Sequence, residues 1–348
     1  MDGIHEILEA IYSSSQGDVL ATIIRVEGSA YRKEGTSMLF RNDGSQVGLL
    51  SAGCLEVDLA CRIEETKNQR TTQTVVYDMR EEEDLSWGQG AGCNGVISVL
   101  LEPIDACLRD HLCKLKFHLE EGKRVTMLKK ITENYNVSDY LFVTDDGNLF
   151  GKWHGGISVQ VKNLLTEIHQ TTRKSGLRFL TELSSQVYLH TFEPKPRLIV
   201  FGAGADAIPL VRLAAQVGFS VIVSDWRSAL CNERCFPDAH KRIVGHPSDV
   251  LSALPLSNLD SVIILTHHFQ KDKELLHQLN GKNLLYLGVL GSSSRTRRLL
   301  EGKAIPSDVN SPVGLAIGAE GPEEIAVSIV AELIQRQRTK RSAKVVCH

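Results

Sequence analysis

The clearest pattern of apolar and polar positions lies in the second half of the chain. Residues 198–201 and 219–224 are short apolar runs, and residues 205–217 between them carry apolar side chains at helical spacing. Buried parallel strands are continuous apolar runs and helices repeat every 3.6 residues, so the pattern predicts a strand, a helix and a second strand. Gly202-Ala203-Gly204 predicts a tight turn whose backbone amides face the start of the helix.

This unit has the features of a dinucleotide-binding turn. Gly202 and Gly204 are expected to let a pyrophosphate approach the backbone, and Ala207 replaces the third glycine of the usual motif. Asp225, 21 residues after Gly204, is expected to accept hydrogen bonds from a ribose diol. Asp206 is expected in the first helical turn, where an acid would either repel a phosphate or favour the positive end of the helix.

The same alternation continues to the end of the chain. Strands are expected near 197, 220, 260 and 284, and helices near 205, 271, 293 and 322. Such alternation is typical of a Rossmann-like, doubly wound parallel sheet. The proline-containing segment 193–196 breaks regular structure just before it, so we expect two domains, residues 1–193 and 194–348.

The first 193 residues predict a mixed α/β fold. Their helical patterns cover 3–14, 55–67, 106–120 and 157–171. Their strand patterns lie near 19–26, 36–41, 46–50, 72–78, 95–102, 124–131, 139–144, 177–182 and 186–192.

Composition narrows the functional classes. The 348 residues, 42% hydrophobic and 23% charged, suit two globular cores. The sequence contains no apolar run of membrane-spanning length and no secretory signal pattern, so we expect a cytoplasmic protein that does not contact membranes.

The charge is distributed unevenly along the chain. Residues 1–193 carry 20 basic and 28 acidic side chains, and residues 194–348 carry 19 basic and 14 acidic side chains, so anion binding is expected in the second half. The basic tail lacks interleaved aromatic residues, which argues against nucleic-acid binding.

Two glycine-rich loops carry the cysteines of greatest interest. Cys54 follows Gly53 at the expected start of a helix, where the helix dipole favours the thiolate, and Cys93 lies in the loop 88–95, which holds four glycines. If the loops meet, two thiols among backbone donors suit a sulfur-rich or anionic ligand; the alternative is that both cysteines pack in tight turns. Cys231 and Cys235 have no second pair of ligands, which argues against zinc, and the eight cysteines in all indicate reduced thiols.

Other candidates are cations and a histidine on loops. Arg32 and Lys33 follow the first strand, and Ser292 and Arg295 stand at a helix start, where both pairs suit an anion. His267 follows an apolar strand at the edge where doubly wound folds bind ligands. Solvated loop charge and an ordinary edge histidine are the alternatives.

These pieces together resemble the xanthine dehydrogenase accessory protein family, the molybdenum cofactor insertion chaperones of the XdhC and CoxI type. The matching motifs are Gly28-Ser29 with Arg32-Lys33 and Gly35, Asp43-Gly44-Ser45 with Gly48, Gly53-Cys54-Leu55-Glu56, Gly92-Cys93 with Gly95, Gly202-Ala-Gly204, Asp225-x-Arg227, Thr266-His267, Gly288-Val-Leu-Gly291-Ser292, Pro312-Val-Gly314 and Pro322-Glu323-Glu324. The departures are Ala52 for a usual Gly, Ala30-Tyr31 for Thr-Pro, Asn94 for Gly and His268-Phe269 for Asp-His.

The resemblance implies a carrier of molybdenum cofactor that serves xanthine dehydrogenase or a related molybdenum hydroxylase in purine catabolism, without catalytic turnover of its own. It implies contact with a cysteine desulfurase-type sulfurtransferase and is compatible with a homodimer. The residues then expected at the cofactor are Arg32, Lys33, Cys54, Glu56, Cys93, Gly202, Gly204, Asp225, His267, Ser292 and Arg295, with Cys54 and Cys93 near molybdenum or its sulfido ligand. A nucleotide or dinucleotide is a further candidate ligand.

Two other functional classes remain open at this stage. An NAD(P)-dependent oxidoreductase would use Asp225 for ribose and His267 as acid or base. A metal-dependent regulator or scaffold would rest on the cysteines alone.

The hypothesis of a cofactor carrier makes one geometric requirement. The thiols of Cys54 and Cys93 have to converge beside the phosphate-binding edge of the second domain, within one chain or between two.

Overall fold

The computed structural model describes residues 3–14, 17–51, 53–80, 94–133, 136–171 and 174–346; for residues 54, 94 and 341–346 it describes the backbone alone. The chain divides into two compact units, Met1–Pro194 and Lys195–His348. The division falls within the proline-containing segment 193–196.

The first unit contains two five-stranded antiparallel sheets. Sheet A has the order β3-β2-β1-β5-β4, with β1 Val19–Ser29, β2 Ser37–Phe40, β3 Gln46–Gly48, β4 Gln73–Asp78 and β5 Asn94–Pro103. Sheet B has the order β8-β7-β6-β10-β9, with β6 Val125–Ile131, β7 Val137–Thr144, β8 Leu149–Lys152, β9 Gly176–Leu180 and β10 Ser185–Phe192. The helical elements are α1 Ile4–Ser13, α2 Cys54–Gln69, α3 Ala106–Glu120, α4 Val159–Thr171 and the short 3-10 helix η2 Thr181–Leu183.

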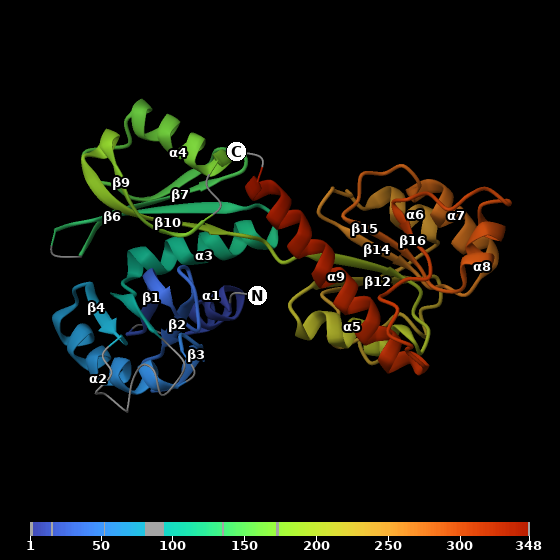
Figure 1. The fold of residues 1–348 in the computed structure, drawn as a ribbon, viewed down its shortest axis with the longest axis horizontal. Coiled ribbons are helices and arrows are strands. Elements are labelled where there is room, and N and C mark those ends of the chain that lie inside the picture. Colours follow the sequence, from blue (N-terminus) through green and yellow to red (C-terminus); the bar gives the residue numbers. More distant parts are fainter. Residues whose placement is uncertain are drawn as a thin grey trace. The chain divides into compact units, whose positions relative to one another are not determined.

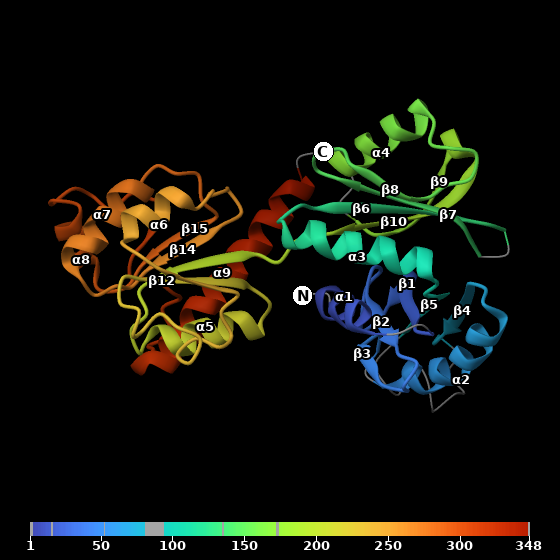
Figure 2. The ribbon, with the colours of Figure 1, turned by 180° about the vertical axis from the view of Figure 1, so that it is seen from behind.

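Helices fill the space between the two sheets and cover their outer faces. Figure 1 and Figure 2 show α3 between the strands of sheet A and sheet B. One apolar core contains residues of α1, of α3 and of the facing sides of both sheets. Helix α1 contributes Ile4, Ile7, Leu8 and Ile11, which lie on one side of the helix because their spacing follows the helical repeat. Helix α2 packs on the other face of sheet A, and α4 on the other face of sheet B.

A buried ion pair also joins the sheets. Lys129 on β6 donates a hydrogen bond to Glu102 on β5, and both side chains are almost completely buried. Removing one member of such a pair leaves an uncompensated buried charge, so the pair fixes how β5 and β6 face each other. The strand patterns in the sequence did not reveal that residues 1–193 hold two separate sheets, since a strand pattern does not identify its partner strand.

The second unit is a six-stranded parallel sheet, sheet C, with the order β13-β12-β11-β14-β15-β16. Its strands are β11 Arg197–Phe201, β12 Ser220–Asp225, β13 Lys241–Val244, β14 Ser261–Ile264, β15 Tyr286–Val289 and β16 Val309–Asn310. Its helices are α5 Ala207–Gln216, α6 Pro247–Ala253, α7 Phe269–Leu279, α8 Ser293–Leu299 and α9 Gly321–Val346. This order confirms the predicted α/β class with a Rossmann-like sheet.

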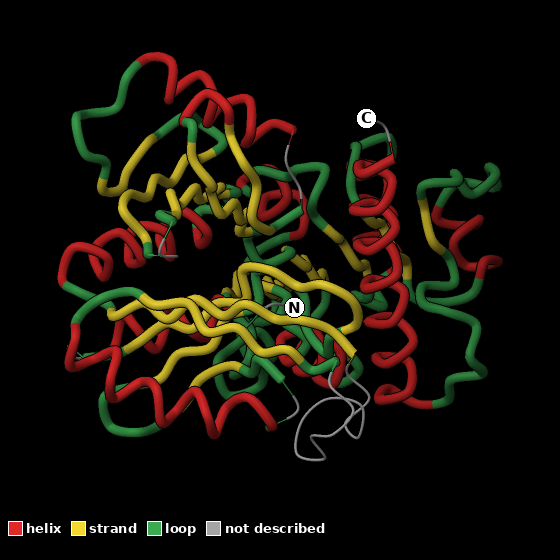
Figure 3. The backbone as a smooth tube through the Cα atoms, turned by 60° about the vertical axis from the view of Figure 1, so that its left-hand side comes forward, coloured by secondary structure: helices red, strands yellow, loops and turns green. Residues whose placement is uncertain are grey.

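The helices of this unit cover both faces of sheet C. Apolar residues of α5 and α9 pack on one face, and those of α6, α7 and α8 on the other. Figure 3 shows α9 as the long red helix that leads to the label C. The strand order reverses between β11 and β14, and ligands of such folds bind at the carboxyl ends of the strands near this reversal. Within the described residues, no helix has the length and apolar character needed to cross a membrane.

Candidate functional site

In the first unit, two candidate loops start from the same end of sheet A. Strands β1 and β5 pair in antiparallel register with Ser29 opposite Asn94. Ser29 leads into the loop that carries Arg32 and Lys33, and Asn94 is the residue after Cys93. The sheet therefore brings together the chain positions next to the predicted cations and next to the second cysteine.

Helix α2 begins at this same end. Asp58, near its start, accepts a hydrogen bond from the Tyr77 hydroxyl (2.7 Å) close to the end of β4, and Thr66, near its end, accepts one from Gln73 (2.6 Å) at the start of β4. The helix thus runs antiparallel to β4, and its first residue, Cys54, lies toward the end of sheet A where β1 ends and β5 starts. We call this region the cysteine end of sheet A.

The predicted meeting of the two thiols stays a prediction. Cys93, with the rest of residues 81–93, lies outside the described residues, as does the side chain of Cys54. The backbone places Cys54 at the first position of a helix of 16 residues, as expected from the sequence, and Gly53 precedes it with a φ of 110° that favours glycine.

Glu56 holds the loop that leads to Cys54. Its carboxylate accepts hydrogen bonds from the backbone amides of Leu50 (3.1 Å) and Ser51 (2.7 Å) and from the Ser51 hydroxyl. The Ser51 oxygen in turn accepts from the amides of Gly53 (3.2 Å) and Leu55 (3.1 Å). These contacts show that Glu56 holds the loop before Cys54; the cofactor contact that the sequence predicted for Glu56 stays a prediction.

The contacts of Glu56 also make the first unit sensitive to acid. Burial alone would raise the pKa of Glu56, but the hydrogen bonds from Ser51 and Leu50 outweigh it and lower the pKa below the ordinary value. A lowered pKa stabilises the fold above the unfolded-state pKa, and this stabilisation is lost as the pH falls through the folded-state value. We therefore expect Glu56→Gln to cost about 1–3 kcal/mol at neutral pH and to flatten the loss of stability below about pH 4.5.

Urea unfolding between about pH 3 and pH 7 measures both effects. The matched control is Glu65→Gln, which changes an exposed residue of the same helix whose carboxylate, among the described residues, accepts a hydrogen bond from Gln69 alone. An equal pH dependence in the wild type and Glu56→Gln would contradict the assignment.

Arg32 and Lys33 are exposed cations at the cysteine end of sheet A. Neither forms an ion pair with a described residue; the Arg32 guanidinium lies 5.4 Å from the ring centroid of Tyr31. The loop is anchored at Gly35, which has a φ of 95° and packs so closely on His190 that a side chain would clash. The two cations are therefore held on an ordered loop with their charges available to an anion.

In the second unit, Gly202 is required by packing within the protein. It has a φ of 120°, and a Cβ at this position would lie 2.4 Å from the carbonyl oxygen of Leu265, next to the end of β14. Its amide donates to Ser224 (2.8 Å). The tight turn expected from the sequence is present, and it is packed against both neighbouring strands.

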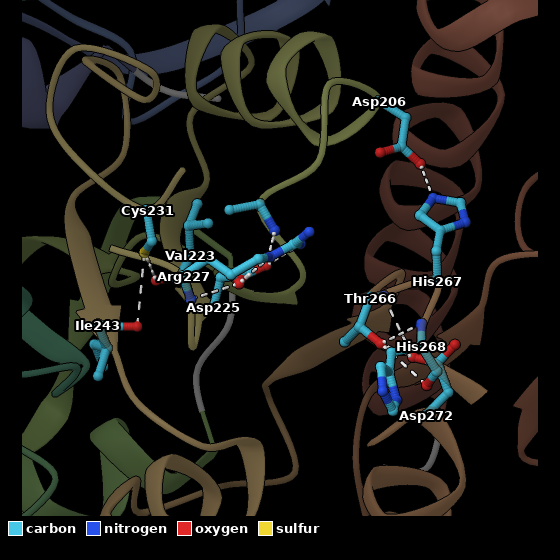
Figure 4. A network of polar contacts seen from close by, with 11 residues as sticks. Asp206, Val223, Asp225, Arg227, Cys231, Ile243, Thr266, His267, His268 and Asp272 are labelled. Carbon is cyan, nitrogen blue, oxygen red and sulfur yellow. Dashed lines mark hydrogen bonds and ion pairs between the residues drawn. The ribbon is translucent and has the colours of Figure 1, made fainter. Parts of the chain in front are cut away.

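Asp225 is buried and fully hydrogen-bonded (Figure 4). Its oxygens accept from the amide of Ala203 (2.8 Å), from the amide and Nε of Arg227 (both 2.9 Å) and from Nη2 of Arg227 (2.8 Å). A carboxylate offers about four acceptor positions, so none is left for the ribose diol that the sequence suggested. Burial opposes ionisation, but the contacts with Arg227 and Ala203 lower the pKa of Asp225.

Asp206 and His267 form a pair beside the glycine turn. Nε2 of His267 lies 2.6 Å from Oδ2 of Asp206 (Figure 4). The sequence placed Asp206 in the first helical turn, but α5 begins at Ala207 and the Asp206 side chain does not cap it. The predicted candidate His267 is therefore an exposed side chain at the end of β14, engaged by a carboxylate rather than open to a ligand phosphate.

Ser292 and Arg295 are occupied within the second unit. The Ser292 hydroxyl caps α8 by accepting from the amide of Arg295 (3.2 Å). The Arg295 guanidinium donates to Asp272 (2.6 Å), whose other oxygen accepts from the Thr266 hydroxyl (2.5 Å). This network connects the segments after β14 and β15, and sequence reasoning missed it because Asp272 has no recognisable motif.

The cysteines of the second unit do not form a described metal site. Cys231 is buried and its thiol donates to the carbonyl oxygens of Val223 and Ile243 (both 3.6 Å), while burial raises its pKa. Among the described residues there is no group of three or more His, Cys, Asp or Glu side chains arranged to hold a metal ion.

Comparisons with known proteins cover almost the whole chain. Family models described as the XdhC and CoxI family, the BH1974-like central domain and the XdhC Rossmann domain match residues 13–78, 106–193 and 198–333. A protein of Bacillus subtilis (strain 168), named as a probable subunit of xanthine dehydrogenase, is 46% identical over 338 residues, which cover 97% of this chain and 98% of that protein.

A more distant relative and a solved structure extend the match. The Escherichia coli (strain K12) molybdenum cofactor insertion chaperone PaoD is 22% identical over 337 residues, covering 92% of this chain and 83% of that protein. A crystal structure from Bacillus halodurans, described as a xanthine dehydrogenase, superposes with a TM-score of 0.85 at 48% identity, covering 98% of this chain and 97% of that chain.

Proposed function

Since the chain belongs to the XdhC and CoxI family of xanthine dehydrogenase accessory proteins, we propose that it binds molybdenum cofactor and delivers it to a molybdenum hydroxylase. The observation that carries the proposal is the similarity to the insertion chaperone PaoD, which extends over 92% of this chain and therefore over both units. A match restricted to the Rossmann-like unit would support only a fold, since such sheets serve many functions.

The cysteine end of sheet A offers groups that suit this cofactor. Molybdenum cofactor is a pterin dithiolene that carries a phosphate and supplies a redox-active metal with soft sulfur ligands. Cys54, at a helix start, and Cys93 would lie near the metal or its sulfido ligand, and Arg32 and Lys33 would meet negative charge. Glu56 would keep the Cys54 loop in place.

The partners and setting form part of the same proposal. The client would be xanthine dehydrogenase or a related hydroxylase of purine catabolism in the cytoplasm, and a cysteine desulfurase-type sulfurtransferase would supply sulfur to the bound cofactor. A homodimer would allow the cysteine end of one chain to meet sheet C of another.

An NAD(P)-dependent oxidoreductase is the weaker alternative. Its ribose ligand would be Asp225, whose acceptor positions are filled by Ala203 and Arg227, and its acid or base would be His267, which is paired with Asp206. Neither residue is poised for that chemistry in this arrangement.

Purification from cells grown with and without molybdate tests the proposal. We expect the full-length chain to retain pterin in both cultures and molybdenum in the first, close to one equivalent of each per binding site. Metal analysis and pterin absorbance of the purified protein measure this. Purified protein free of pterin from molybdate-replete cells that contain active molybdenum enzymes would contradict the proposal.

A further inference from the structure

The glycine turn of sheet C is a poor place for a ligand phosphate. The amides of Gly202 and Ala203 already donate to Ser224 and Asp225. The carboxylate of Asp206 lies against Gly204, where a Cβ would be 2.7 Å from Oδ1. A negative charge at this position repels a phosphate, and the bond to His267 keeps it there.

Positive charge gathers instead around an indole beside the turn. Trp226 follows β12, and its ring centroid lies 4.6 Å from the guanidinium carbon of Arg227 and 4.4 Å from Nζ of Lys271 on α7. The ring of His268 meets the indole edge-on at 5.9 Å, and Lys271 also donates to His246, which follows β13 (3.3 Å). We call these five residues the cationic edge.

The residues of the cationic edge come from segments on both sides of the glycine turn. Trp226 follows β12 and Lys271 follows β14, and these two strands are the neighbours of β11 in sheet C. Their contact spans the carboxyl end of β11, where the strand order reverses. This is the position at which doubly wound sheets bind ligands.

One cation of this edge, Lys271, is not balanced by a described acid, and the other, Arg227, is paired with Asp225 on one side only. Arg227 gives Nε and Nη2 to Asp225, which leaves Nη1 without a hydrogen bond to any described residue. Lys271 forms no ion pair with the described carboxylates; its ammonium contacts the indole of Trp226 and Nδ1 of His246. Contact with an aromatic face holds a cation in place without neutralising it.

We propose that the cationic edge binds the phosphate monoester of a small ligand. A phosphate monoester has close to two negative charges at neutral pH and three acceptor oxygens, which can accept hydrogen bonds from Lys271 Nζ, Arg227 Nη1 and Nε2 of His246 or His268. The site favours a phosphate over a sugar diol because Asp225 lacks a free acceptor and Arg227 stands beside it. The inference rests on the proposed function where the ligand is the phosphate-bearing pterin of molybdenum cofactor; the other source of the same chemistry is a 2′-phosphorylated dinucleotide.

Equilibrium dialysis of the full chain with two matched pairs of probes tests the proposal. One pair is the air-oxidised pterin derived from the cofactor, with its phosphate and after phosphatase treatment. The other pair is NADPH and NADH, which differ in one phosphate monoester. In at least one pair, we expect the phosphorylated member to bind about tenfold or more tightly, the effect of one charge-assisted contact.

Substitutions on α7 assign that preference to the cationic edge. Lys271→Gln is expected to reduce it to about twofold or less, and Lys271→Arg, which keeps the positive charge and the cation–π contact with Trp226, to preserve it. The matched control is Lys273→Gln on the same helix, whose lysine pairs with Glu301 (2.7 Å) and is absent from the edge. Thermal unfolding of each variant checks that the fold is retained.

The outcomes separate this proposal from the proposed function. A preference confined to the nicotinamide pair supports the cationic edge and counts against the cofactor as its ligand, whereas a preference in the pterin pair supports both. Equal binding within both pairs, binding of none of the four probes, or a preference that survives Lys271→Gln would overturn the cationic edge as a phosphate site.

Discussion

Replacement of Cys54 by alanine is expected to remove most of the molybdenum cofactor that co-purifies with the chain. Cys54 is the first residue of α2, a position that favours the thiolate, and Glu56 and Ser51 hold the loop before it. Loss of a soft contact near the metal is expected to lower retention about tenfold or more, comparable to the loss of a partner in a metal site. Pterin and molybdenum content of the purified variant measure the change.

Cys61→Ala is the matched control for this experiment. Cys61 is an exposed free cysteine on the same helix, seven residues further along, so the substitution removes a thiol without touching the cysteine end of sheet A. We expect it to retain cofactor like the wild type. Equal retention by both variants would reject the role of Cys54.

Replacement of Asp225 by alanine is expected to destabilise the second unit by about 2–3 kcal/mol, because the Arg227 charge that it leaves unpaired is partly exposed to water. The carboxylate is buried and accepts four hydrogen bonds, so its removal leaves the amide of Ala203 and the Arg227 guanidinium without their acceptor. The turn at Gly202 would lose a contact that ties it to β12. This is a structural effect and does not depend on any ligand.

Fluorescence of Trp226 during urea unfolding measures the effect in this unit. Substitution of Trp87 and Trp153 by phenylalanine leaves Trp226 as the sole tryptophan. Asp238→Ala, which changes an exposed aspartate without a described ion pair, is expected to shift stability by no more than about 0.5 kcal/mol. If the free energy of unfolding of Asp225→Ala equals that of this control and the substitution alters only ligand binding, Asp225 is a ligand-binding residue and does not stabilise the fold.

Most of the secondary structure was predictable because its signals are local. The expected helix at 106–120 coincides with α3, and the expected parallel sheet forms with its order reversing beside the glycine turn. The elements that were missed are short: β8, η2, β13, α6 and β16 have two to seven residues, too few for a periodic pattern. The separation of residues 1–193 into two sheets was also missed, since it depends on contacts distant in sequence.

The sequence identified the residue types at the candidate site, but not which of their side chains are engaged by neighbouring protein groups. Glu56 and Arg295 lie in motifs that suggest ligand contacts, yet each is engaged by neighbouring protein groups. Whether an acid or a cation is free or paired depends on which loops the fold brings together. The group around Trp226 shows the converse, because no short motif joins it with Lys271, 45 positions later.

The core shared by sheets A and B has a consequence for dissecting this protein into fragments. Family models place residues 13–78 and 106–193 in different segments, but α3 and the Glu102–Lys129 pair belong to the packing of both sheets. A truncation between these two segments would expose the apolar side of α1 to water. It would also leave either Glu102 or Lys129 without its charged partner. The smallest soluble fragment of the amino-terminal half is therefore expected to be the intact stretch up to about residue 194.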